Sequence, residues 1–382
     1  MNPWRGLKGL PRGMWVLALS TLVNRMGTMA VFFLALYLVG GRGWTEAQAA
    51  TAFAVYGLGA LAASPFSGWF SDRFGHRLTL ALSLGLSAAL LMAIPSVHSR
   101  AFLLPVIALW SAATQAYYPA SMALITDLVP GEKRKQAFVL HRLASNLGIS
   151  VGPALGGFIA HASYDALFWI DGLTTFLGLG VLLAFVPSPP PEPAPALPSL
   201  PGWKDRRLLW LLAAILPATA VFTQIHGALP LWVVQGLGRG TQVFGLLFTL
   251  NTGLILLLEV AVNHRLAHWS HGHQLALGAG LITLGFASLA WMRPLPLLVV
   301  ATVVWSLGEM VFLPASTDAV ASLAPPDRRG QYLGLYSLVW TVALTVGPWL
   351  GLVAYGWGGP WAVWGGSGAL GLVSVALAFR KS

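Results

Sequence analysis

The sequence predicts an all-α integral membrane protein with twelve transmembrane helices in two six-helix, pseudo-symmetric halves. Three observations lead to this prediction: long apolar segments, a one-sided distribution of basic residues, and an internal repeat. Of the 382 residues, 56% are hydrophobic and only 9% are charged, which is far from the composition of a soluble domain. Cysteine is absent, so disulfide bonds and thiolate chemistry are excluded.

Twelve apolar segments are long enough to cross a membrane as helices, which takes about 20 residues. The first six are expected at 14–39, 47–71, 78–97, 102–127, 137–160 and 167–186. The second six are expected at 207–236, 242–262, 273–292, 297–320, 330–355 and 359–379. A proline-rich segment, 187–206, separates the two sets and is expected to be an extended cytoplasmic linker. The predicted domains are therefore 1–186 and 207–382.

Lysine and arginine are concentrated on one side of the predicted membrane. With the N-terminus inside, 16 of the 22 basic residues lie in inner segments and four lie in outer loops. The remaining two, Arg25 and Arg142, lie within spans. By the positive-inside rule both termini are then cytoplasmic, and the expected location is the cell inner (plasma) membrane. This topology accounts for the net charge of +10, so a nucleic-acid partner is not expected.

The two halves repeat each other at a constant shift of 195 residues. The shift places Trp110-Ser111 on Trp305-Ser306, Pro119-Ala120-Ser121 on Pro314-Ala315-Ser316, and Gly152-Pro153 on Gly347-Pro348. Spans 4 and 5 therefore correspond to spans 10 and 11. Parallel repeats of this kind place a substrate site near the middle of the membrane, where the halves meet.

The segment between the second and third spans is a very short charged turn. Gly68, Asp72, Arg73, Gly75 and Arg77 follow the pattern Gly-x-x-x-Asp-Arg-x-Gly-x-Arg. This pattern resembles the signature loop between helices 2 and 3 of the major facilitator superfamily, and the resemblance covers the whole chain. It implies the major facilitator fold, and it implies a gating role for Asp72, Arg73 and Arg77. The alternative is an ordinary cytoplasmic turn.

In that superfamily the acid at the position of Asp72 caps a helix of the other half and latches the inner side shut. Here Gly330 begins the eleventh span, and a carboxylate is favoured at a helix N-terminus. The resemblance therefore implies a latch between Asp72 and the start of that span.

Span 5 contains a second pattern, formed by Gly148, Gly152, Pro153, Gly156 and Gly157. It resembles the Gly-x-x-x-Gly-Pro-x-x-Gly-Gly motif of antiporters in the superfamily, and so implies export by exchange. Glycines four residues apart also let helices approach closely. A close helix contact that serves either direction of transport is therefore the alternative interpretation.

Glu309 lies near the middle of span 10, where its repeat mate is Thr114. A charged acid there costs about 2.5–3.5 kcal/mol on insertion scales. Its protonation is expected to depend on hydration, as a proton-coupling residue requires. Trp305 and Phe312 share its helix face and are expected to line a substrate cavity. The alternative is a structural acid bonded between helices.

Arg25 lies near the middle of span 1, next to Asn24 and one turn before Thr28. An arginine keeps its charge, so it needs an anion or water. Three interpretations stay open: a proton-coupling pair with Glu309 across the cavity, a site for an anionic substrate headgroup, or a structural pairing with helix-end carbonyls. Asn24 and Thr28 are predicted to line the substrate cavity.

Other polar or aromatic residues within the spans are weaker candidates. Gln115, Tyr118 and Trp340 are predicted to line the cavity, with packing as the alternative, and Tyr117 is a further polar aromatic residue in span 4.

Several charged residues lie nearer the span ends. Arg142 is expected to pair with Asp127 in an inner gate. Asp171 and His226, toward the outer ends of spans 6 and 7, could form an outer gate or a second proton site, or simply lie at the interface. Glu259 is interpreted as structural.

The resemblance is greatest to the twelve-span drug:proton antiporter group. It implies a secondary active transporter that exports an amphipathic or lipophilic small molecule in exchange for protons by alternating access. The alternatives are a lipid or lysolipid flippase, a sugar-efflux carrier, and a non-transporting membrane sensor on the same scaffold. The expected partners are a small-molecule substrate, protons and the lipid bilayer, and a monomer is expected.

Enzyme signatures are missing from the sequence, so an enzyme is not expected. A proton gradient, and no cofactor, is the expected energy source. His264 and His268 are four residues apart, but no acid or cysteine completes a metal site, and a bound metal is not expected.

Overall fold

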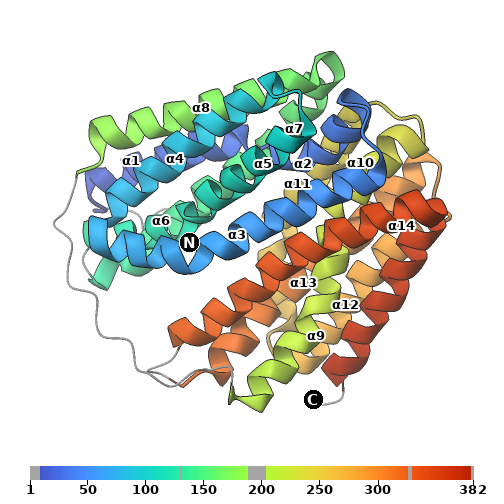
Figure 1. The fold of residues 1–382 in the computed structure, drawn as a ribbon. Helices are drawn as coiled ribbons and strands as arrows, with labels where there is room; N and C mark the ends of the chain where they lie inside the picture. The colour runs from blue at the N-terminus through green and yellow to red at the C-terminus, as the bar shows by residue number, and fades with distance from the viewer. Residues whose placement is uncertain (1–8, 130, 188–203, 326–328, 380–382) are drawn as a thin grey trace. The chain divides into compact units, whose positions relative to one another are not determined.

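The computed structural model describes residues 9–129, 131–187, 204–325 and 329–379, and no strand occurs among them (Figure 1). Contacts divide the chain into two compact units. The first comprises Met1–Phe33 and Val55–Pro195, and the second comprises Leu34–Ala54 and Ala196–Ser382. Most of the predicted linker, 188–203, lies outside the described residues. The division into two six-helix halves stays a prediction.

The helices of the first part of the chain are α1 (Arg12–Gly27), α2 (Ala30–Leu36), α3 (Glu46–Phe74), α4 (His76–Ala93), α5 (Arg100–Gln115), α6 (Tyr117–Leu128), α7 (Arg134–Ala162) and α8 (Tyr164–Phe185). The second part contains α9 (Arg206–Phe222), α10 (Ala228–Leu231), α11 (Thr241–Leu266), α12 (His271–Ser288), α13 (Leu295–Leu323) and α14 (Arg329–Phe379). In the first unit α8 packs beside α1 and α4, and in the second unit α12 packs beside α13 and α14 (Figure 1).

Ten helical stretches in the described part of the chain are long and apolar enough to cross a membrane. α12, which coincides with the ninth predicted span, is not among the ten. The eleventh and twelfth predicted spans form one helical stretch, α14, whose backbone leaves helical geometry at Gly358 and Gly359. The protein is therefore a multi-pass membrane protein, and the number twelve stays a prediction.

The first and seventh predicted spans are both discontinuous. α1 ends at Gly27 and α2 begins at Ala30. In the second unit α9 ends at Phe222, a short 3-10 segment covers Thr223–His226, and α10 begins at Ala228. The shift of 195 residues also places one π-helical turn, Tyr37–Gly41, on another, Trp232–Gly236. The sequence repeat thus extends to irregular backbone geometry.

Glycines of the repeat bring equivalent helices together within each unit. A side chain at Gly152 of α7 would lie 2.9 Å from the carbonyl oxygen of Thr28. The repeat mate of Gly152 is Gly347, where a side chain would collide with the Thr223 hydroxyl. Because Thr223 is the mate of Thr28, both contacts occur at equivalent positions. The glycines of both Gly-Pro pairs therefore lie where two helices are in close contact.

Candidate functional site

The break in the first span is held by an acid from a neighbouring helix. Asp171 of α8 accepts hydrogen bonds through Oδ2 from the backbone N–H groups of Met29 (3.2 Å) and Ala30 (3.0 Å). It is 5% exposed. Irregular backbone within a membrane requires such partners, and an acid is favoured at the start of a helix. Asp171 is therefore a buried cap on α2.

Arg25 lies one turn before this break. Its guanidinium carbon is 4.9 Å from the centroid of the Tyr117 ring, a cation–π contact. Within the described residues its buried Nε has no hydrogen-bond partner. Its side chain also makes no bond to a helix-end carbonyl there, so the third interpretation of Arg25 is not supported. The pairing with Glu309 joins two different units and stays a prediction.

A cavity of about 60 Å³ lies beside the break, within the first unit. Asn24, Arg25 and Thr28 line it, as does Asp171. The rest of its wall comes from Val31, Tyr56, Ser83, Leu84, Ser87, Leu91, Trp110, Thr114, Tyr117 and Thr175. A volume of this size holds a few water molecules.

Gln115 and Tyr118 are not in the wall of the cavity at the break, and their predicted contact with a substrate stays a prediction. Gln115 is the last residue of α5 and is not in the wall of this cavity. Tyr118 is 61% exposed, whereas Tyr117, its neighbour, faces Arg25 and donates a hydrogen bond to the Thr21 hydroxyl at 3.1 Å. Successive residues of a helix point about 100° apart, so only one of the two tyrosines can face the cavity.

Glu309 is the buried acid of the second unit. Its Oε2 accepts a hydrogen bond of 2.8 Å from Nδ2 of Asn251, which lies on α11. The same nitrogen lies 3.0 Å from the Ser306 hydroxyl. In the part of the chain that the structure describes, no basic side chain is within ion-pair distance of Glu309. Asn251 was missed by the sequence reasoning, although an asparagine in the middle of span 8 is a recognisable signal.

The repeat places these polar groups at equivalent positions in the two units. Subtracting 195 from Asn251, Ser306 and Glu309 gives Tyr56, Ser111 and Thr114. Tyr56 and Thr114 both line the cavity of the first unit. The polar positions are therefore shared, while the acid belongs to the second unit.

Trp305 and Phe312 are buried within the second unit. They are 2% and 1% exposed, and they pack where Gly285 and Gly278 of α12 leave room. At i−4 and i+3 both side chains are displaced from Glu309 toward the same side of the helix, by roughly 40° and 60°. α12 covers that side, and the expectation that the two residues line a substrate cavity stays a prediction.

Trp340 belongs to an aromatic cluster of the second unit. Its ring meets the Phe222 ring edge-on at 6.2 Å, and Phe222 in turn meets Trp305 at 6.1 Å. The predicted contact of Trp340 with a substrate stays a prediction.

The signature turn is tighter than expected. α3 continues to Phe74 and α4 begins at His76, so Gly75 alone makes the turn. Its φ of +95° lies in the region that favours glycine. Asp72 and Arg73 consequently lie in the last turn of α3, and the exposed Arg73 side chain lies over the Trp69 ring at 5.9 Å.

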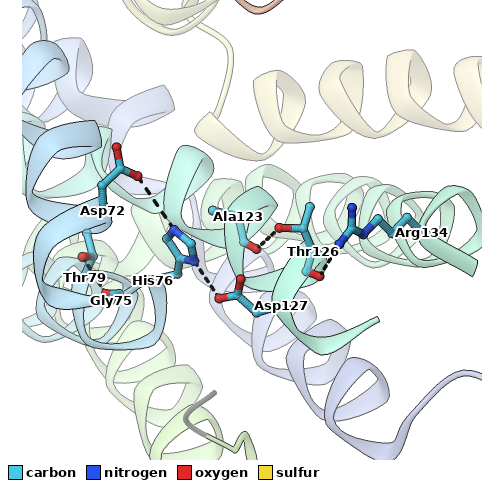
Figure 2. Close-up of polar contacts among 8 residues, drawn as sticks. All are labelled: Asp72, Gly75, His76, Thr79, Ala123, Thr126, Asp127 and Arg134. Carbon is cyan, nitrogen blue, oxygen red and sulfur yellow. Dashed lines mark hydrogen bonds and ion pairs between the residues drawn. The ribbon is translucent and has the colours of Figure 1, made fainter. Parts of the chain in front are cut away.

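His76, which the sequence reasoning did not select, connects two acids (Figure 2). Its Nδ1 lies 2.6 Å from Oδ2 of Asp127, and its Nε2 lies 3.9 Å from Oδ1 of Asp72. The partner of Asp127 is thus His76, so the expected pairing of Asp127 with Arg142 is wrong. The mate of His76 in the repeat, His271, lies 2.8 Å from Asp318.

The Arg77 side chain binds backbone carbonyl groups and not an acidic side chain. Its Nε and Nη2 donate to the carbonyl oxygens of Val186 and Leu183, each at 2.8 Å. These carbonyls belong to the last turn of α8, where cations are favoured. Arg77 therefore fixes the end of α8 to the start of α4. The latch between Asp72 and Gly330, in different units, stays a prediction.

The antiporter motif packs α7 against the break in the first span. A side chain at Gly148 would lie 2.5 Å from Cβ of Arg25, and one at Gly156 would lie 3.0 Å from Cβ of Met29. Pro153 and Gly157 are buried in the same helix. The motif therefore positions the residues that flank the cavity.

A multi-pass fold with buried polar groups at broken helices defines a membrane transporter. The model of the Major Facilitator Superfamily matches residues 17–301 and 243–382, so the chain belongs to this superfamily. The signature turn correctly predicted this membership.

Two relatives illustrate the resemblance. The "Multidrug resistance protein MdtH" of Aeromonas salmonicida (strain A449) is 25% identical over 96% of this chain and 94% of its own length. The "Na(+), Li(+), K(+)/H(+) antiporter" of Planococcus maritimus is 25% identical over 78% of this chain and 80% of its own. The second relative is by its name a transporter that exchanges cations for protons.

The fold is also found in solved structures. A peptide transporter POT in complex with sulfate superposes with a TM-score of 0.80, and the match covers 99% of this chain and 96% of that chain. The sequence identity is 19%, so this similarity concerns the fold alone.

Proposed function

We propose that the protein exports an amphipathic or lipophilic small molecule from the cytoplasm in exchange for protons, by alternating access. Two distant relatives, named as a multidrug resistance protein and as a cation/proton antiporter, support this choice within the superfamily. The complete antiporter motif supports it as well. The protein works as a monomer in the inner (plasma) membrane, with both termini in the cytoplasm.

The observation that carries the proposal is the bond between Glu309 and Asn251. A carboxyl group that is paired with a fixed cation is held in its charged form. The partner of Glu309 is a neutral amide, which can donate to a carboxylate or accept from a carboxylic acid. Both protonation states of Glu309 therefore keep a hydrogen bond. Hydration from one side of the membrane or the other then decides which state is favoured.

The test is transport by purified protein in proteoliposomes that carry an imposed pH gradient. Ethidium, Hoechst 33342 and naphthalene-2-carboxylate serve as probes, and pyranine inside the vesicles reports proton movement. We expect the gradient to drive movement of at least one probe, with a proton flux in the opposite direction. If the purified protein moves none of the three probes and no protons, the result would support the alternative of a non-transporting membrane sensor.

Glu309→Gln is the decisive variant because it keeps the shape and a hydrogen bond to Asn251 but cannot exchange a proton. We expect it to abolish the part of transport that depends on the gradient while probe binding persists. Asp318→Asn is the matched control, since it neutralises an exposed acid on the same helix, α13. Normal coupling in Glu309→Gln would refute the assignment of the proton site.

A further inference from the structure

The cavity at the break in the first span has an uneven balance of hydrogen-bond donors and acceptors. The Ser83 hydroxyl donates to the Ala113 carbonyl at 2.7 Å, and the Tyr117 hydroxyl donates to Thr21. Thr175 donates to Oδ1 of Asn24 at 2.9 Å, which leaves Nδ2 of that amide without a partner among the described residues. Among the described residues, the unused donors of the cavity therefore include those of Asn24 and Arg25.

The two charged residues in the cavity wall, Asp171 and Arg25, also differ in how many of their hydrogen-bonding groups have partners. Asp171 already accepts two backbone hydrogen bonds from the start of α2. Arg25 has an aromatic ring on one side and a buried Nε with no partner in the described chain. Arg25 therefore keeps an unused buried donor beside a carboxylate that the backbone of α2 already engages.

We propose that the cavity bounded by Asn24, Arg25 and Thr28 binds the anionic group of the transported molecule, so that the substrates are amphipathic organic anions such as carboxylates. This inference deepens the proposed function and rests on it. A guanidinium and an adjacent amide can each donate to one carboxylate, and hydrogen bonds between charged groups are among the strongest in proteins. The packing of Gly148 on Arg25 holds this donor in place.

The cavity is small. A volume of about 60 Å³ has room for a few water molecules, and the carboxylate group of a ligand fits in the same space.

The test is equilibrium binding to the full-length protein in phosphatidylcholine nanodiscs, without a pH gradient. The probes are naphthalene-2-carboxylate, its neutral isostere naphthalene-2-carboxamide, and 2-naphthylmethylammonium. We expect the carboxylate to bind about tenfold to hundredfold more tightly than the carboxamide, as expected for loss of a charged hydrogen-bond partner. Equal binding of the three probes would overturn the proposal, whatever happens to the protein variants.

Arg25→Gln should remove the preference for the carboxylate, and Arg25→Lys should restore part of it. Arg100→Gln, which removes an exposed arginine at the start of α5, is the matched control and should keep the full preference. Thermal unfolding without ligand checks that each variant is folded. If Arg25→Gln does not fold, Asn24→Ala replaces it and should weaken carboxylate binding.

A phospholipid headgroup is the other source of an anionic group. If the carboxylate fails to bind, and only phosphatidylglycerol in the nanodisc stabilises the protein in a manner that depends on Arg25, the site belongs to lipid and the proposal is overturned. Because no gradient is applied, these results do not depend on Glu309. Selective binding without proton-coupled movement would leave the anion site in place and remove the proposed transport.

Discussion

Asp205 connects two helices of the second unit through one carboxylate. Its Oδ1 accepts from the backbone N–H of Arg207 at 2.8 Å and so caps α9. Its Oδ2 accepts from the Tyr332 hydroxyl, near the start of α14, at 2.7 Å. The hydrogen bond from Tyr332 lowers the pKa of Asp205 below its ordinary value. The charged form of Asp205 is therefore favoured in the folded protein.

This shift has a defined consequence for stability as a function of pH. A lowered pKa in the folded state stabilises the protein above the unfolded pKa, about 3.9 for aspartate. The stabilisation is lost as the pH falls through the lower, folded value. Tyr332→Phe should therefore reduce the free energy of unfolding at pH 6 to 7, by less than about 1 kcal/mol because the carboxylate is solvated. The difference should vanish in acid.

Thermal unfolding of wild type and Tyr332→Phe between pH 7 and pH 3, followed by tryptophan fluorescence, measures this effect. Tyr336→Phe controls for the loss of a hydroxyl on the same helix, because Tyr336 contacts Ser316 and not Asp205. A constant difference between wild type and Tyr332→Phe over the whole pH range would contradict the role of the carboxylate.

At the residue scale, the sequence identified the charged residues that a membrane disfavours but not their partners. Arg25 and Glu309 stand out because charge within a span is costly. Tyr117 and Asn251, which contact them, are polar but uncharged, and the sequence reasoning did not identify them as partners. A partner depends on which helix packs on which face, and the helix's own sequence does not contain that information.

At the element scale, the glycine motif of α7 makes the contact with α1 possible. An ideal side chain at Gly148 would lie 2.5 Å from Cβ of Arg25 and 2.9 Å from the Leu22 carbonyl oxygen. Both distances are shorter than a carbon contact allows. Any residue larger than glycine must push the two helices apart.

Gly148→Ala should therefore destabilise the protein by about 1–3 kcal/mol, the usual cost of overpacking. It should also displace Arg25 and weaken binding of naphthalene-2-carboxylate. Gly180→Ala on α8 is the control, because a side chain at Gly180 meets no atom within 4 Å. Thermal unfolding and ligand binding measure the two effects, and wild-type stability in Gly148→Ala would show that the helices are not in close contact.

The sequence predicted the elements better than it predicted their breaks. The described ends of most spans lie within a few residues of the expected ones, because apolar length determines them. The breaks at Thr28 and Thr223 were not anticipated. The residue at each break is a threonine and not a proline or glycine. Each break depends on hydrogen bonds to another helix, such as those that Asp171 accepts from Met29 and Ala30. The role of His76 was missed because it occupies a variable position of the signature pattern.

At the scale of the whole molecule, the repeat separates shared architecture from specific chemistry. The glycine contacts and the breaks at Thr28 and Thr223 occur in both units at a shift of 195 residues, and the π-helical turns repeat in the sequence at the same shift. The acid of the second unit has a threonine at the equivalent position of the first unit, and Arg25 of the first unit has Ala220 as its mate. The proton site proposed for one unit and the anion site proposed for the other would therefore have arisen because equivalent positions of the two units diverged.

The topology is the remaining prediction at this scale, and the absence of cysteine makes it directly measurable. His98 lies in a predicted outer loop and Glu132 in a predicted inner loop, and both are exposed. The excess of basic residues on one side predicts that an impermeant maleimide labels His98→Cys in intact cells and labels Glu132→Cys only after permeabilisation. The cysteine-free wild type gives the background for both. Labelling of Glu132→Cys in intact cells would reverse the orientation, and with it the assignment of transport as export.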